Sequence, residues 1–169
     1  MVETSRLSII PLTYPQLELY MQGEGKLEKE FRLAMTGRIV APDIKERVIE
    51  LILPKVKAAI ADEYLFYTFW IVIEKASKII VAELGFKGEP NKDGEIEIGY
   101  GTMHEQRKKG YMTEAVSGMI DWAKQHADVK YILAETDENN RASIKVLKKN
   151  KFRFYDKREK MKWWKIRVK

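Results

Sequence analysis

Three consecutive cations, Arg107, Lys108 and Lys109, precede Gly110 at a point where the sequence changes from a strand-like to a helix-like pattern. The first N–H groups of a helix have no partner within the helix and carry a partial positive charge, so helix N-termini bind phosphate groups well. Glycine also lets a phosphate approach the backbone closely. This combination suits a ligand with clustered phosphates. A solvated basic loop with a tight turn is the structural alternative, and these residues alone do not decide between the two.

The composition of the chain limits its class. Its 169 residues, 45% of them hydrophobic and 33% charged, fit one globular domain over residues 1–169. The absence of cysteine excludes a disulfide framework and a thiolate metal site, and two histidines are too few for a typical histidine site, so we expect no metal. The longest apolar run, residues 69–73, is too short to span a bilayer, and the N-terminus does not resemble a signal peptide. We therefore expect a cytoplasmic protein without a membrane partner.

The order of elements follows from hydrophobic periodicity. Strands are predicted where β-branched and aromatic residues cluster or alternate, and helices where apolar residues recur every three or four positions. The predicted strands span residues 6–12, 66–73, 78–86, 95–103, 131–136, 152–156 and 161–168. The predicted helices span residues 14–22, 43–62, 113–126 and 140–150, and Pro54 should kink or split the second of them. This order predicts a single mixed α/β (α+β) domain, with a central sheet of about six to seven strands flanked by helices.

Three blocks of the sequence, in this order along the chain, resemble the GNAT superfamily of acetyltransferases. Arg107-Lys108-Lys109-Gly110-Tyr111-Met112 is similar to the superfamily signature R/Q-x-x-G-x-G/A. The segments SRLSIIPLT, IEIGYGTMHEQRKKGYMTEA and ENNRASIKVLKKNKFR resemble blocks of the branch that contains the RimJ/RimL-like ribosomal-protein N-terminal acetyltransferases. Together the blocks cover residues 4–12 and about 80–155, and they fall on matching predicted elements.

The sequence departs from that branch at four positions. Met112 stands where glycine or alanine is usual, and we expect its side chain to face the packing surface of the helix. Lys151 replaces the glycine that usually precedes Phe152, and Ile10 replaces an arginine. Leu147 stands where some members of the superfamily carry a catalytic tyrosine, which removes one candidate for the general acid.

The resemblance implies transfer of an acetyl group from acetyl-CoA to an amine. The backbone N–H groups of residues 108–112 would bind the diphosphate of acetyl-CoA, and the strand before the loop would pair with its pantetheine arm. An N–H group near Thr102 would hold the developing oxyanion. Because the chain has no cysteine, direct attack in a ternary complex is favoured over a relay through the protein. The implied cofactor-binding residues are Tyr100, Gly101, Thr102, Met103, Arg107, Lys108, Lys109, Gly110, Tyr111, Met112, Asn140 and Ser143.

Two residues are predicted to act in catalysis. Glu97 is the candidate general base because it lies on the strand that should flank the acetyl group, and Glu95 and Glu83 are its competitors. The alternative for Glu97 is a surface glutamate in an alternating strand. Ser143 fits the superfamily position for a proton donor to the departing thiolate, and its alternative role is to cap the first turn of a helix. Tyr155 is a further candidate donor.

The acceptor amine is the feature that the sequence determines least. Residues 13–65 should form one wall of the acceptor cleft, and the segment GEGKLEKEFRLAMTGR within it has no dense acidic cluster of the kind that a polyamine or an aminoglycoside would favour. We predict that the acceptor is the α-amine of a peptide or protein. A small-molecule amine (polyamine, amino acid or aminoglycoside) is the alternative.

Alternatives of another class are a non-catalytic acyl-CoA-binding domain and a nucleic-acid-binding domain. The net charge of +6 invites an anionic partner. The cations are interleaved with 25 acidic residues, however, and no RNA-binding aromatic motif is present. We therefore expect no nucleic-acid partner. For the oligomeric state, we expect either a monomer or a homodimer.

Overall fold

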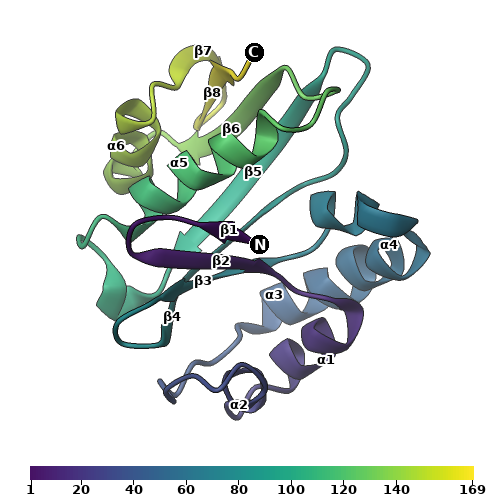
Figure 1. Cartoon of the computed structure of the whole chain (residues 1–169). Coiled ribbons are helices and arrows are strands. Elements are labelled where there is room, and N and C mark those ends of the chain that lie inside the picture. The colour runs from purple at the N-terminus through teal and green to yellow at the C-terminus, as the bar shows by residue number, and fades with distance from the viewer.

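The computed structural model describes residues 1–169 as one eight-stranded sheet with helices on both faces (Figure 1). The strands are β1 (Val2–Glu3), β2 (Leu7–Pro11), β3 (Trp70–Glu74), β4 (Ile79–Phe86), β5 (Glu95–Thr102), β6 (Tyr131–Asp137), β7 (Arg153–Arg158) and β8 (Met161–Arg167). The helices are α1 (Tyr14–Gln22), α2 (Lys26–Glu30), α3 (Pro42–Arg47), α4 (Leu53–Ala58), α5 (Tyr111–Ala123) and α6 (Arg141–Lys149). A π-helical segment, η1 (Val48–Ile52), joins α3 to α4, and 3-10 turns occupy η2 (Ala61–Phe66) and η3 (His104–Gln106).

The sheet separates in its middle. Its strand order is β1-β2-β3-β4-β5-β6-β8-β7, and every neighbouring pair is antiparallel except β5 and β6. These two parallel strands pair only from Glu95 to Glu97, against Tyr131–Leu133. Beyond that point, from Ile98 to Thr102, β5 remains paired with β4, but its edge toward β6 has no strand partner. Because α5 lies in the crossover from β5 to β6, its N-terminus follows shortly after the unpaired edge.

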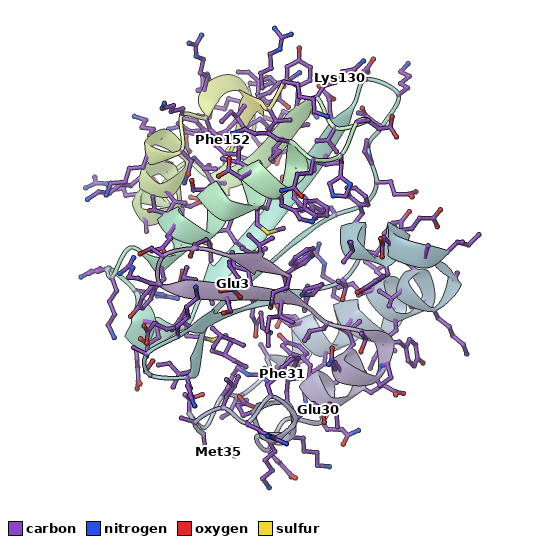
Figure 2. All side chains as sticks on the ribbon, in the orientation of Figure 1. Glu3, Glu30, Phe31, Met35, Lys130 and Phe152 are labelled. Carbon is purple, nitrogen blue, oxygen red and sulfur yellow. The ribbon has the colours of Figure 1, made fainter.

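Two hydrophobic cores lie on opposite faces of the sheet. Successive residues of a strand point to opposite faces, and Trp70 of β3 accordingly belongs to the core under α5 and α6, whereas Ile71 belongs to the core under α1 to α4. In Figure 1, α1 to α4 gather at the lower right and α5 and α6 at the upper left. Figure 2 shows Phe152 on the α6 side and Phe31 on the α2 side, each packed against the core of its own layer.

The predicted fold class is confirmed, and the differences from the predicted elements have local causes. All seven predicted strands are present, and the additional strand is β1, whose two residues are too few to produce an alternating pattern. The predicted helix over 43–62 is interrupted by η1 and ends at Ala58. The irregular segment η1 ends two residues before Pro54, which lies in the first turn of α4, so the helix changes its geometry next to the proline. None of the helices combines the length and apolar character that crossing a bilayer requires.

Candidate functional site

A cavity of about 970 Å³, the first cavity, opens between the unpaired edge of β5 and the helices α5 and α6. Of the residues predicted to bind the cofactor, its lining includes Tyr100, Gly101, Thr102, Arg107, Lys108, Gly110, Tyr111, Met112, Asn140 and Ser143. Two predicted residues lie outside the lining. Met103 packs against the core on the α1 to α4 side, and the ammonium group of Lys109 donates a hydrogen bond to Gln106 at 2.8 Å.

The N-terminus of α5 presents unused N–H groups at the mouth of the first cavity. The backbone N–H groups of residues 108–113 donate no hydrogen bond within the protein. Gly110 is the N-cap of α5 and has a φ of 84°, a left-handed conformation that favours glycine, and Lys108 has a φ of 64°. Left-handed residues in such a turn direct successive N–H groups into a concave anion-binding surface. Met112 is buried in the core, as its sequence position predicts.

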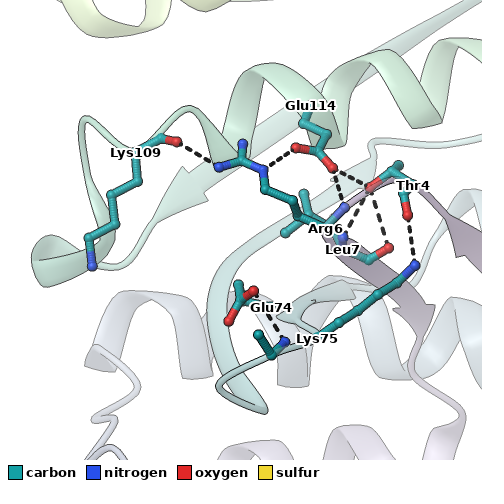
Figure 3. A network of polar contacts seen from close by, with 8 residues as sticks. Thr4, Arg6, Leu7, Glu74, Lys75, Lys109 and Glu114 are labelled. Atoms are coloured by element: carbon teal, nitrogen blue, oxygen red, sulfur yellow. Dashed lines mark hydrogen bonds and ion pairs between the residues drawn. The ribbon is translucent and has the colours of Figure 1, made fainter.

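A network between the N-terminal strands and α5 supports this loop (Figure 3). The carboxylate of Glu114 accepts hydrogen bonds from the Thr4 hydroxyl at 2.7 Å, from the Arg6 backbone N–H at 2.8 Å and from Arg6 Nε at 2.7 Å. Arg6 also donates to the Lys109 carbonyl at 3.2 Å, and its guanidinium lies 4.9 Å from the centre of the Tyr111 ring. The role of Arg6 was not predicted, because its partners lie more than 100 residues away in the sequence.

Glu114→Gln should reduce stability in a pH-dependent way. Partial burial alone would raise the pKa of Glu114, but the hydrogen bonds from Thr4 and Arg6 outweigh it and lower the pKa below its ordinary value of 4.5. The stabilisation is therefore present above pH 4.5 and is lost as the pH falls through the folded-state pKa. We expect the substitution to lower the free energy of unfolding by about 1–3 kcal/mol at neutral pH, and by less in acid, in urea denaturation.

Asp121→Asn is the matched control on the same helix. The Asp121 side chain is largely exposed and pairs only with Lys124, so its substitution should change the free energy of unfolding by less than about 0.5 kcal/mol. A loss in Glu114→Gln that is equal at neutral and acid pH would contradict the assigned role of the carboxylate.

A second cavity, of about 320 Å³, lies on the opposite face of β4 and β5, beneath α3, η1 and α4. The first and second cavities share the lining residues Arg47, Lys87, Gly99, Tyr100 and Gly101. Gly99 and Gly101 carry no side chain, and a Cβ added at Gly101 would meet no atom within 4 Å. A ligand that follows β5 in the first cavity can therefore meet a ligand in the second cavity beside these two glycines.

Glu83 of β4 is the only carboxylate that lines the second cavity, and it lies directly opposite Gly101 in the β4–β5 pairing. The Tyr20 hydroxyl donates a hydrogen bond to it at 2.8 Å, and Arg38 Nη1 lies 3.6 Å away. Burial raises the pKa of Glu83; Tyr20 and Arg38 oppose this shift, and the nearby Glu28 adds to it. Burial likewise raises the pKa of Tyr20, so this phenol remains a hydrogen-bond donor. A carboxylate with a raised pKa beside a cavity can accept a proton from a ligand.

Glu97, the predicted general base, lies outside the lining of both cavities. Its carboxylate forms an ion pair with Lys87, whose ammonium also binds Glu135 at 2.8 Å. Burial alone would lower the pKa of Lys87, but the hydrogen bonds to Glu135 and Glu97 outweigh it and raise the pKa, so Lys87 stays a cation. Glu95 is paired with Lys165 at 2.6 Å. Of the three glutamates considered as the general base from the sequence, only Glu83 lines a cavity.

Ser143 and Tyr100 meet in the first cavity. The Tyr100 hydroxyl lies 2.9 Å from Ser143 Oγ, and either atom can donate the hydrogen bond. Burial raises the pKa of Tyr100 to about 12, although the hydrogen bond to Ser143 opposes this shift, so the phenol is protonated at neutral pH. The first turn of α6 is capped by Asn140, which accepts a hydrogen bond from the Ser143 N–H at 3.0 Å. Tyr155 lies on the edge strand β7, 44% exposed and outside both cavities.

Five cations that line the cavities were not among the predicted site residues. Lys145 and Lys149 line the first cavity, Lys55 lines the second, and Arg47 and Lys87 line both. The spacing of four residues between the two lysines places them on one face of α6, and this is a sequence signal that could have identified them. Arg47 and Lys87 carry no such signal, because they come from separate elements that meet only in the folded chain.

Comparison with known proteins agrees with this architecture. The acetyltransferase (GNAT) domain matches residues 29–153. The uncharacterized N-acetyltransferase YjdG of Bacillus subtilis is 30% identical over 166 residues, which cover 97% of this chain and 96% of that protein. The fold is also similar to the crystal structure of the ribosomal-protein-S5-alanine acetyltransferase from Vibrio fischeri, with a TM-score of 0.69, 15% identity and coverage of 98% of this chain and 95% of that chain. A structure of RimL, the ribosomal L7/L12 alpha-N-protein acetyltransferase, in complex with coenzyme A gives a TM-score of 0.68 at 12% identity, with 97% and 95% covered. The matched domain spans most of the chain, which therefore belongs to the GNAT family of acetyltransferases.

Proposed function

We propose that the chain is an acetyl-CoA-dependent N-acetyltransferase that transfers an acetyl group directly to a primary amine, the α-amine of a peptide or protein. One observation carries this proposal: the two cavities meet at Gly99 and Gly101. One cavity offers unused N–H groups for phosphates, and the other offers a carboxylate with a raised pKa for an amine. The two substrates of a direct transfer would meet at the shared glycines.

On the donor side, the N–H groups of residues 108–113 would bind the diphosphate of acetyl-CoA, with Arg107 and Lys108 adding electrostatic attraction. The unpaired edge of β5 would hydrogen-bond the pantetheine arm and direct it toward the junction of the cavities. Lys145 and Lys149 lie on the α6 side of the first cavity and are placed to meet a further phosphate. RimL, which has a similar fold, was solved in complex with coenzyme A, and this supports coenzyme A as the kind of ligand that the first cavity binds.

On the acceptor side, we prefer Glu83 to Glu97 as the general base. An α-amine has a pKa of about 7.7–8.0 and must lose a proton before it attacks. Glu83 would accept that proton, directly or through one water, because it is the carboxylate that lines the second cavity and faces Gly101. Glu97 is paired with Lys87 and lines neither cavity.

In the transfer itself, the amine nitrogen forms a bond to the acetyl carbonyl carbon while the bond from that carbon to sulfur breaks. A backbone N–H of β5 would stabilise the negative charge that develops on the carbonyl oxygen. The departing thiolate has a basicity near that of a cysteine thiolate, with a pKa of about 8.5, and would take a proton from the hydroxyl pair of Ser143 and Tyr100. Glu83 would take one proton from the ammonium group before the attack, on the face of β5 opposite the hydroxyl pair. The nitrogen would release its second proton to solvent as the bond to sulfur breaks, and solvent would return a proton to the hydroxyl pair.

The test of this proposal is a panel of acceptors at equal concentration. Peptides that begin with alanine or serine, spermidine, an aminoglycoside and free amino acids are incubated with the protein and acetyl-CoA, and acetylated products are identified by mass spectrometry. We expect the peptides to gain one acetyl group at the α-amine. Acetylation of the small amines alone would show that the peptide assignment is wrong. Binding of acetyl-CoA without any product would show a non-catalytic acyl-CoA-binding domain.

A further inference from the structure

The second cavity has an excess of positive charge. Arg47, Lys55 and Lys87 line it, and Glu83 is its only acidic residue. Lys87 is neutralised by its two glutamate partners outside the lining. Neither Arg47 nor Lys55 forms an ion pair. Lys55 makes a cation–π contact with Tyr67, whose ring centre lies 5.2 Å from the ammonium nitrogen. Two unpaired cations therefore remain beside this cavity.

These two cations project from one continuous helical wall. Arg47 ends α3, Lys55 lies in α4, and Leu51 of the π-helical segment η1 lines the cavity between them. Leu51 is 56% exposed although it is apolar, so the wall offers one uncovered aliphatic side chain flanked by two cations. A π-turn inside a helix rearranges which side chains face the same side, and such turns occur frequently at functional sites.

The two cations differ in their distance from the junction of the cavities. Arg47 lines both cavities, as Gly99 and Gly101 do, whereas Lys55 lines only the second cavity. The unused N–H groups that would hold the diphosphate belong to residues 108–113, none of which lines the second cavity. An anion that binds Arg47 and Lys55 together would therefore belong to the ligand of the second cavity and would lie close to its reacting amine.

We propose that Arg47 and Lys55 form an anion subsite, so that the preferred acceptor carries a carboxylate within a few bonds of the amine that is acetylated. This inference rests on the proposed function and narrows its substrate class. The carboxylate belongs either to an acidic side chain at the second position of a peptide or to a free amino acid. A guanidinium group binds a carboxylate through two parallel hydrogen bonds, and an ammonium group adds attraction. The same charges repel a polyamine or an aminoglycoside.

The decisive experiment compares matched acceptors. Peptides that begin Ser-Glu and Ser-Gln differ only in the side-chain carboxylate. Alanine and alaninamide differ in the α-carboxylate and, through it, in the pKa of the amine, so this pair is compared at a pH at which both amines are neutral. We expect wild-type kcat/KM to be about 10- to 100-fold higher for the acidic member of a pair, since hydrogen bonds to charged groups contribute on that scale. The double substitution Arg47→Gln and Lys55→Gln should bring the ratio close to one. Lys57→Gln removes one positive charge, as each half of the double substitution does, at an exposed residue of α4 outside the cavity, and it should keep the wild-type ratio.

A binding measurement separates failure of the subsite from failure of the proposed function. The acetylated products N-acetyl-Ser-Glu and N-acetyl-Ser-Gln are titrated into the protein with coenzyme A present, which requires no catalysis. If no amine is acetylated, the proposed function fails. The ratio of the affinities for N-acetyl-Ser-Glu and N-acetyl-Ser-Gln then still shows whether the anion subsite exists. A wild-type ratio near one, or a preference that survives the double substitution, would overturn the subsite.

Discussion

Gly110→Asp is expected to weaken acetyl-CoA binding by about 100-fold or more while leaving the fold intact. The added carboxylate would lie at the N-terminus of α5, where residues 108–113 present their unused N–H groups to the diphosphate. Like charges placed together at a binding surface cost several kcal/mol, and each 1.4 kcal/mol corresponds to about tenfold in affinity. The effect is measured by calorimetric titration of the variant with acetyl-CoA.

The fold should tolerate this substitution for two reasons. Aspartate and asparagine are among the non-glycine residues that adopt the left-handed conformation most readily, and both are favoured N-caps. A Cβ at Gly110 would meet only the guanidinium of Arg6, at 3.5 Å, and this group is already engaged by Glu114. Thermal unfolding should therefore begin at nearly the same temperature in the variant and in the wild type.

Gly110→Asn is the matched control, since it adds nearly the same atoms without the charge. Its affinity for acetyl-CoA should fall by about tenfold or less, and the affinity of the wild type should fall as salt is added, because part of the attraction is electrostatic. If the Asp and Asn variants bind acetyl-CoA equally, charge at this position does not matter and the diphosphate does not lie at this helix N-terminus.

The donor side of the site could be predicted from the sequence because its determinants are local. The cations, Gly110 and the start of α5 lie within a few residues of one another, and the recognition uses backbone groups whose position depends only on where a helix begins. The same holds for Asn140, which caps α6 three residues before Ser143. Lys151 is a further case: it has a φ of 64°, so the turn after α6 keeps its left-handed conformation where the family usually has glycine.

The acceptor side could not be predicted to the same extent, because its determinants meet only in the folded chain. Glu83 and Glu97 both alternate with apolar residues on neighbouring strands, and nothing in that pattern shows which of them faces a cavity. The difference arises from contacts between distant elements. Tyr20 and Arg38 reach Glu83 from residues 13–65, and Glu97 is paired with Lys87 and lines neither cavity. The same reason explains why the cations of the second cavity were not predicted.

Glu83→Gln is expected to lower kcat by about 10²- to 10⁴-fold at neutral pH, the usual contribution of a positioned general base. Acetyl-CoA affinity should not change, because Glu83 does not line the first cavity. Burial raises the pKa of Glu83 above its ordinary value of 4.5, so wild-type activity should fall as the pH falls through that raised pKa and the carboxylate becomes protonated. The variant should lack this limb of the pH profile, and its deficit should shrink above about pH 8, where an α-amine is already neutral.

Two control variants separate this role from other roles in the same site. Glu97→Gln removes a carboxylate that lies outside both cavities, so it should retain the wild-type pH profile of kcat. Ser143→Ala removes a proton donor rather than a base, and it should lower kcat by about 10- to 100-fold without altering the acid limb. If Glu97→Gln abolishes the acid limb and Glu83→Gln preserves it, the general base is Glu97 and the assignment of Glu83 is wrong. Glu83→Gln and Glu97→Gln both replace a glutamate by its isosteric amide, and the two residues lie on adjacent strands. A difference between their pH profiles therefore depends on the position of the lost carboxylate and not on the kind of substitution.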